Sequence, residues 1–164
     1  MGSARRRKIF LDANVVIRAG KPPGGPLITR LADLVDAGYV NVVTTDLTKM
    51  EIAKKHASND FEVMGGLTKR RVRDLADEIL EIKIPEISLA QLHRRLLEKY
   101  KSTVEEMFSS LRAETLSIDS VKLSVVFDAY LYKTGLFGDN IKKDHFPDAF
   151  IFETLRATAT KDDP

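Results

Sequence analysis

Residues 8–17 read KIFLDANVVI, and this short stretch decides the fold. It begins with an apolar run and then reaches a carboxylate at Asp12. An apolar run without polar alternation is typical of a buried strand in a parallel sheet. We therefore predict a buried strand that ends at Asp12. In open parallel sheets, binding sites form at the carboxyl ends of the strands, so Asp12 is a candidate site residue.

The elements that follow this strand predict an α/β fold. A loop rich in proline and glycine (21–26) leads into a helix that is expected to end near Gly38. A second apolar strand (39–44) precedes a helix that is expected to run to about His56. Strands and helices that alternate through short connections favour a parallel sheet.

The middle of the chain has a different pattern, because apolar residues between 67 and 134 recur mostly with helical spacing. A capping box formed by Ser88 and Gln91 predicts the start of a long helix. We expect a helical insertion over about residues 60–134, within a single domain that spans 1–164. The last predicted element is a helix from about residue 147 to 158.

The composition restricts the class of protein and the chemistry. Of the 164 residues, 43% are hydrophobic and 30% are charged, which is typical of a soluble globular domain. No apolar run approaches the roughly 20 residues that span a bilayer, so we expect a cytoplasmic protein without a membrane partner. The absence of cysteine excludes disulfides and thiolate metal sites. A net charge of +2 neither favours nor excludes nucleic-acid binding.

Three carboxylates fall where such a sheet would bring them together. Asp12 ends the first strand, Glu51 lies early in the helix after the second strand, and Asp148 lies in the first turn of the last helix. Clustered carboxylates repel one another unless a cation neutralises them, and Mg²⁺ and Mn²⁺ prefer oxygen ligands. A bound metal of this kind can activate water for attack on a phosphodiester.

Each acid also has a structural interpretation, which the sequence alone leaves open. Asp12 could cap a helix, and Glu51 could close a capping box with Thr48. Asp148 could stabilise the helix dipole. The basic clusters of the middle segment are more typical of solvated helix faces than of a phosphate-binding surface.

Three segments together resemble the PIN-domain nuclease family: KIFLDANVVI (8–17), VVTTDLTKMEI (42–52) and KKDHFPDAFIFETL (142–155). The third resembles a PIN-like subfamily that has a KKDxFPDA motif after a helical insertion. The resemblance implies a three-layer α/β/α fold with a central parallel sheet and a Mg²⁺ or Mn²⁺ site. It also implies hydrolysis of phosphodiester bonds by an endoribonuclease, with RNA that we expect to be single-stranded as the substrate.

The resemblance further implies roles for individual residues. Asp12 and Asp148 would be metal ligands, and Glu51 would bind metal or orient the attacking water. Supporting positions, which would orient these acids or bind substrate, are Asn14, Asp144, Lys142 and Lys143.

The chain departs from the PIN pattern at its C-terminal end. PIN domains commonly carry a further acid after one more strand, but no apolar strand precedes Asp162 and Asp163. We therefore expect either a truncated chain that lacks C-terminal strands, or a catalytically impaired module that binds RNA or a protein partner. An exposed sheet edge would favour a homodimer. An inhibitory protein partner, or action on DNA or a phosphate monoester, stays open as well.

Overall fold

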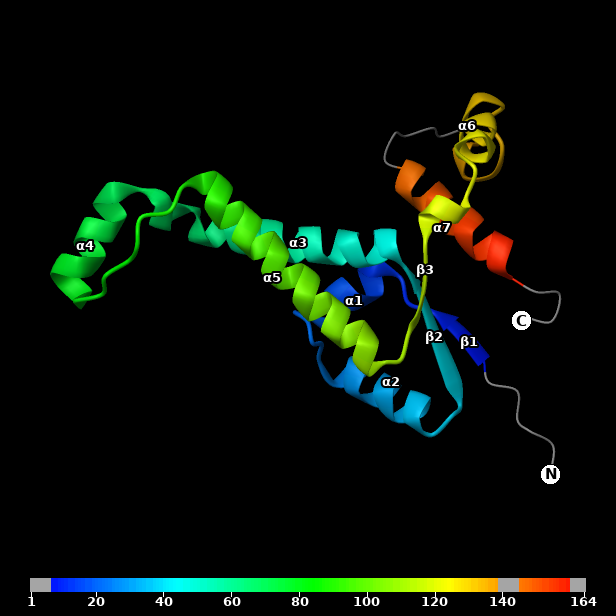
Figure 1. The fold of residues 1–164 in the computed structure, drawn as a ribbon, viewed down its shortest axis with the longest axis horizontal. Helices are drawn as coiled ribbons and strands as arrows, with labels where there is room; N and C mark the ends of the chain where they lie inside the picture. Colours follow the sequence, from blue (N-terminus) through cyan, green and yellow to red (C-terminus); the bar gives the residue numbers. More distant parts are fainter. Residues whose placement is uncertain (1–6, 139–144, 160–164) are drawn as a thin grey trace.

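A small parallel sheet lies at the centre of the fold (Figure 1). The computed structural model of the chain describes residues 7–138 and 145–159. Within these residues the sheet has the order β1-β2-β3, and both pairs of strands are parallel. The strands are β1 (Arg7–Phe10), β2 (Val40–Thr45) and β3 (Glu114–Leu116).

Helices make up most of the described residues, and each strand is followed by one. They are α1 (Ala13–Ala19), α2 (Pro26–Asp36), α3 (Asp46–Met64), α4 (Arg70–Leu80), α5 (Leu89–Ser110), α6 (Leu123–Leu131) and α7 (His145–Thr158). Short 3-10 helices are η1 (Gly65–Thr68), η2 (Ile118–Ser120) and η3 (Gly135–Phe137). No helix in the described part of the chain is long and apolar enough to cross a membrane.

Helices cover both faces of the sheet, which confirms the predicted three-layer α/β arrangement. On one face, α1, α3 and α5 enclose the main core, whose fully buried side chains include Val16, Ile52 and Phe108. On the other face, α7 lies over the sheet, and Phe10, Val43 and Leu155 line a cavity of about 230 Å³ between them. A second small core joins α6, η3 and α7.

The first strand is less buried than its sequence predicts. Arg7 and Lys8 are exposed, and Ile9 and Phe10 are only half-buried. The prediction of a fully buried strand is therefore wrong. The physical reason is position: β1 lies at the edge of the described sheet, so β2 covers it on one side only.

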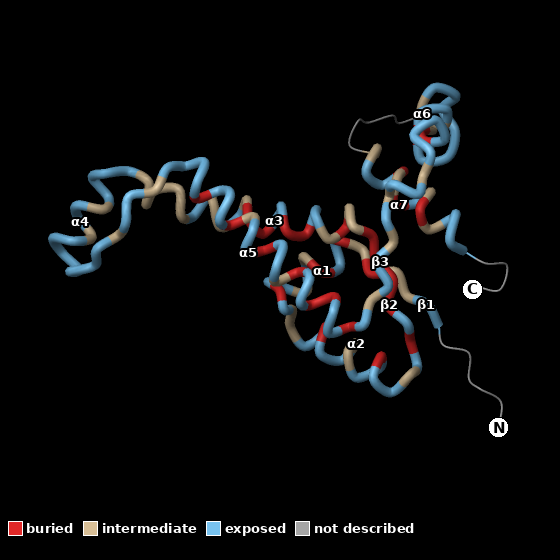
Figure 2. The backbone as a smooth tube through the Cα atoms, viewed as in Figure 1, coloured by how far each residue is buried: buried red, intermediate tan, exposed pale blue. Residues whose placement is uncertain are grey.

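A long arm extends from the sheet, formed by α3 and α5 side by side, with α4 across its tip (Figure 1). The prediction that α3 ends near His56 is wrong, because the helix continues to Met64. Its distal half stays helical because Phe61 and Met64 pack against the core along α5. Burial falls along the arm, from the red segments beside the sheet to the pale blue α4 (Figure 2).

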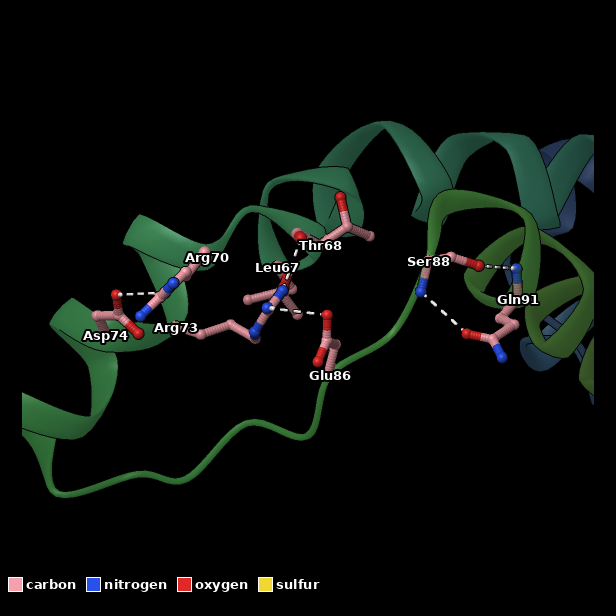
Figure 3. A network of polar contacts seen from close by, with 8 residues as sticks. All are labelled: Leu67, Thr68, Arg70, Arg73, Asp74, Glu86, Ser88 and Gln91. Carbon is pink, nitrogen blue, oxygen red and sulfur yellow. Dashed lines mark hydrogen bonds and ion pairs between the residues drawn. The ribbon is translucent and has the colours of Figure 1, made fainter.

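Strand β3 lies inside the segment that the sequence predicts to be helical. It pairs with β2 through Thr44 and Thr115. A strand of three residues is too short to show a periodic pattern in the sequence, so β3 could not be predicted. Its extended conformation depends on pairing with β2. The capping box at the start of α5 is confirmed, because Ser88 N–H donates to Gln91 Oε1 (3.0 Å) and Gln91 N–H donates to Ser88 Oγ (3.2 Å) (Figure 3).

Candidate functional site

Three elements begin at the carboxyl end of the sheet, and each carries one of the predicted acids. Asp12 follows β1 and is the N-cap of α1. Glu51 lies in the second turn of α3, which begins directly after β2. Asp148 lies in the first turn of α7, and α7 contacts α3. Parallel strands bring their carboxyl ends to one edge, which explains how residues so far apart in sequence approach one another.

The charges of Asp148 and Asp12 act on the carboxyl group of Glu51. Partial burial raises the pKa of Glu51 above its ordinary value, and the negative charges of Asp148 and then Asp12 raise this pKa further. Lys54 opposes the shift, because its positive charge stabilises the ionised carboxylate. The site is therefore a place of carboxylate repulsion, which a bound cation would relieve.

The donor chemistry of the site fits a hard divalent metal. All three acids offer carboxylate oxygen, the ligand type that Mg²⁺ and Mn²⁺ prefer. As their side chains lie, however, no group of three or more His, Asp or Glu within residues 7–138 and 145–159 could hold a metal ion. The acids are thus close enough to repel one another without forming a preassembled set of three ligands.

The helix-cap interpretation of Asp12 agrees with the structure. Its Oδ1 accepts a hydrogen bond from the backbone N–H of Asn14 (2.8 Å). The half-buried carboxylate keeps further acceptor positions, so capping and metal binding are compatible. The described contact of Asn14 with Asp12 is made by the Asn14 backbone N–H. The Asn14 side chain is exposed.

The capping-box interpretation of Glu51 is wrong. Thr45 is the N-cap of α3, and its Oγ1 accepts a hydrogen bond from the backbone N–H of Thr48 (3.0 Å). Thr48 is the third residue of α3 and not its N-cap, so Glu51 has no capping box to close there. Within the described part of the chain, no hydrogen bond or ion pair uses the Glu51 carboxylate. Glu51 is exposed on α3, and it lies close enough to Asp148 and Asp12 for their charges to raise its pKa.

The remaining predicted residues are placed less fully. Asp148 is exposed in the first turn of α7, where it also interacts favourably with the helix dipole, so both of its interpretations stay open. Asp144, Lys142 and Lys143 lie outside the described residues.

The sequence as a whole decides the family. The family model described as the PIN domain matches residues 9–164, a range that includes all three acids. The chain belongs to the PIN domain family. PIN domains are generally nucleases, and they typically use divalent metals. No curated protein and no solved structure matches the chain.

Two further residues at the site of this PIN domain were not predicted. Asp46, the first residue of α3, accepts hydrogen bonds from Ser117 Oγ (2.8 Å) and from the backbone N–H of Ile118 (3.2 Å). It thereby anchors the connection from β3 to η2 near the acidic edge, the edge of the sheet that carries Asp12, Glu51 and Asp148. Lys54 follows Glu51 by three residues, a helical spacing that could have identified it as a neighbour.

Replacing Glu51 by glutamine should make the metal-free protein at least as stable as wild type at neutral pH. A pKa that is raised in the folded state means that the folded protein binds this proton more tightly than the unfolded chain. The resulting stability is present at acidic pH and is lost as pH rises through the folded pKa. The variant should therefore gain stability relative to wild type as pH rises, which thermal unfolding without metal would measure.

Glu62→Gln is a suitable control, because Glu62 is exposed on the same helix α3, farther along the arm. The difference in stability between Glu62→Gln and wild type should change little with pH. Loss of stability in Glu51→Gln that grows with pH would show that the Glu51 charge stabilises the fold, and would contradict the repulsion described above.

Proposed function

We propose that this PIN domain is a Mg²⁺- or Mn²⁺-dependent endoribonuclease that hydrolyses phosphodiester bonds in single-stranded RNA. The observation that supports the proposal best is that the charges of Asp148 and Asp12, which belong to two other segments, raise the pKa of Glu51. Acids that repel one another in a place without structural need for them are typical of a functional site.

The proposed roles follow from the position of each acid. Asp12 and Asp148 would hold the metal, since each offers an oxygen donor at the start of a helix. The metal, when bound, would neutralise charge on the phosphodiester and lower the pKa of a bound water. Glu51 would orient the attacking water and accept its proton. A raised pKa suits this role, because a stronger base takes up a proton more readily at neutral pH.

A second candidate function is a binding module that has lost its chemistry. One observation favours it: the described acids do not form a group of three that could hold a metal as they lie. Such a module would bind RNA or a protein partner without turnover. The cleavage assay described next separates the two functions.

The test is cleavage of single-stranded RNA and single-stranded DNA of the same sequence, in Mn²⁺, in Mg²⁺ and in chelator. We expect RNA cleavage that requires the metal and disappears in Asp12→Asn. Asparagine is also a good N-cap, so the variant should keep the start of α1 intact. Asp33→Asn, at an exposed site on α2, is the matched control and should cleave like wild type.

Each alternative outcome has a clear meaning. Cleavage of DNA alone would overturn the substrate assignment and keep the nuclease. No cleavage of either nucleic acid by the wild type would replace the nuclease with the binding module. Cleavage by Asp12→Asn at the wild-type rate would show that the acidic edge is not the active site.

A further inference from the structure

Helix α4 carries an apolar stripe that nothing in the described structure covers. Val72, Leu75, Ile79 and Leu80 recur at helical spacing along one side of the helix. Their exposed fractions are 37, 43, 68 and 62%, and α4 has no buried residue at all. An amphipathic helix normally buries such a stripe, so a partner surface is missing here.

The orientation of α4 is nevertheless held by specific contacts, so the stripe is a defined surface. Arg73 Nη1 donates a hydrogen bond to the carbonyl of Thr68 (2.6 Å), and Arg73 Nη2 lies 4.0 Å from Glu86 in the returning segment (Figure 3). Arg70 pairs with Asp74 within the helix (3.6 Å). These contacts tie α4 to both sides of the arm and leave its apolar stripe exposed.

The charges of α4 are divided along the helix. The N-cap and first turn carry the basic residues Lys69, Arg70, Arg71 and Arg73. The acidic residues Asp74, Asp77, Glu78 and Glu81 follow toward the C-cap. A second α4 placed antiparallel would bring the basic half of each helix against the acidic half of the other. The helix is therefore complementary to itself about a two-fold axis, which is the symmetry of most homodimers.

Arg71 and Glu78 show this complementarity most directly. Seven residues apart, they lie two turns from each other on the same flank of the stripe, next to Leu75. Both are exposed, and neither has an ion-pair partner in the described part of the chain. A two-fold axis midway between them exchanges their positions. Each Arg71 would then meet Glu78 of the other copy, which gives two such contacts in one dimer.

We propose that a second copy of this chain covers α4, through an antiparallel, two-fold pairing of the α4 helices at the tips of two arms. Val72 and Leu75 of each copy would form the centre of the contact, and Arg71 and Glu78 would flank it. The pairing would leave the acidic edge free, because α4 lies at the far end of the arm from α7 (Figure 1). The proposal does not depend on nuclease activity.

RNA fits this surface less well than a second copy. The aliphatic stripe offers no aromatic ring on which a base could stack. The acidic half of α4 would repel phosphates, and Arg70 and Arg73 are already engaged within the chain.

The test is the mass of the full chain in solution, measured by sedimentation equilibrium over a range of concentrations. Wild type should be a dimer in equilibrium with monomer. Leu75→Asp should be a monomer. Leu123→Asp is the matched control, because Leu123 is 60% exposed on α6, far from α4, and it should leave the dimer unchanged.

Charge reversal then tests the antiparallel pairing itself. Arg71→Glu and Glu78→Arg should each weaken the dimer by about tenfold, because each creates two like-charge contacts in a symmetric interface. The double variant should recover the wild-type dissociation constant, since the pair is restored with reversed sign. Glu98→Arg, at an exposed site on α5, should have no such effect.

A monomeric wild type at every soluble concentration would overturn the proposal. A dimer that survives Leu75→Asp would place the interface outside α4. If only Leu123→Asp abolished the dimer, the interface would lie on α6. Single reversals that fail to weaken the dimer, or a double variant that fails to recover, would exclude the antiparallel pairing. Thermal unfolding of every variant shows that the fold is retained in each comparison.

Discussion

Asp148→Asn is expected to lower metal-dependent RNA cleavage by at least about a hundredfold. Mutating a residue that only hydrogen-bonds to a metal ligand typically costs about 10–100-fold, and loss of a ligand itself should cost more. The substitution preserves size and removes one charge from the acidic edge, where Asp148 raises the pKa of Glu51. The variant should therefore bind Mn²⁺ more weakly, and higher Mn²⁺ should recover part of the activity. Cleavage rates over a range of Mn²⁺ concentrations measure both effects.

The helix-dipole interpretation of Asp148 makes a different prediction. If Asp148 only stabilises α7, the substitution should cost about 0.3–1 kcal/mol of stability and leave cleavage by the folded protein unchanged. Thermal unfolding and cleavage of the same sample thus separate the two roles. Asp128→Asn, at an exposed position on the neighbouring α6, is the matched control and should affect neither cleavage nor Mn²⁺ dependence.

Phe108→Ala should destabilise the fold by about 3–5 kcal/mol, the usual cost of truncating a buried aromatic side chain. Phe108 lies on α5, is 1% exposed and belongs to the core between the helices and the sheet. Lys49 of α3 extends over its ring, 5.6 Å from the centroid, so the substitution also removes a contact between α3 and α5. The free energy of unfolding of a typical domain is only about 5–15 kcal/mol, so this loss is large.

Chemical denaturation measures the change as a lower midpoint. Phe152→Ala is the matched control, because Phe152 is half exposed on α7, and it should cost much less. Equal losses in the two variants would show that the main core around Phe108 does not limit the stability of the fold.

Much of the secondary structure follows from local sequence signals. The Ser88 and Gln91 side chains form the capping box that the spacing predicts, because both partners lie within one turn of the same helix. The sequence predicts the last helix from about residue 147 to 158, and the structure has it from 145 to 158. Helical periodicity and capping depend on residues only a few positions apart, so a single sequence contains the information.

Elements that depend on a distant partner could not be predicted in the same way. Strand β3 is extended because β2 lies beside it, and β1 is half exposed because no described strand covers its other edge. The burial of a strand is a property of its neighbours, and the apolar run at residues 9–11 carries no information about how many neighbours there are.

The sequence by itself determined the family, since the match to the PIN domain covers residues 9–164. It also predicted Asp12, Glu51 and Asp148 as the candidate acids. Only the tertiary structure decided that Glu51 is not part of a capping box and that Asp12 and Asp148 raise its pKa. It also decided that the apolar stripe of α4 is left uncovered. The physical reason is that residue type is a local property, whereas burial and electrostatic repulsion arise only between segments that folding brings together.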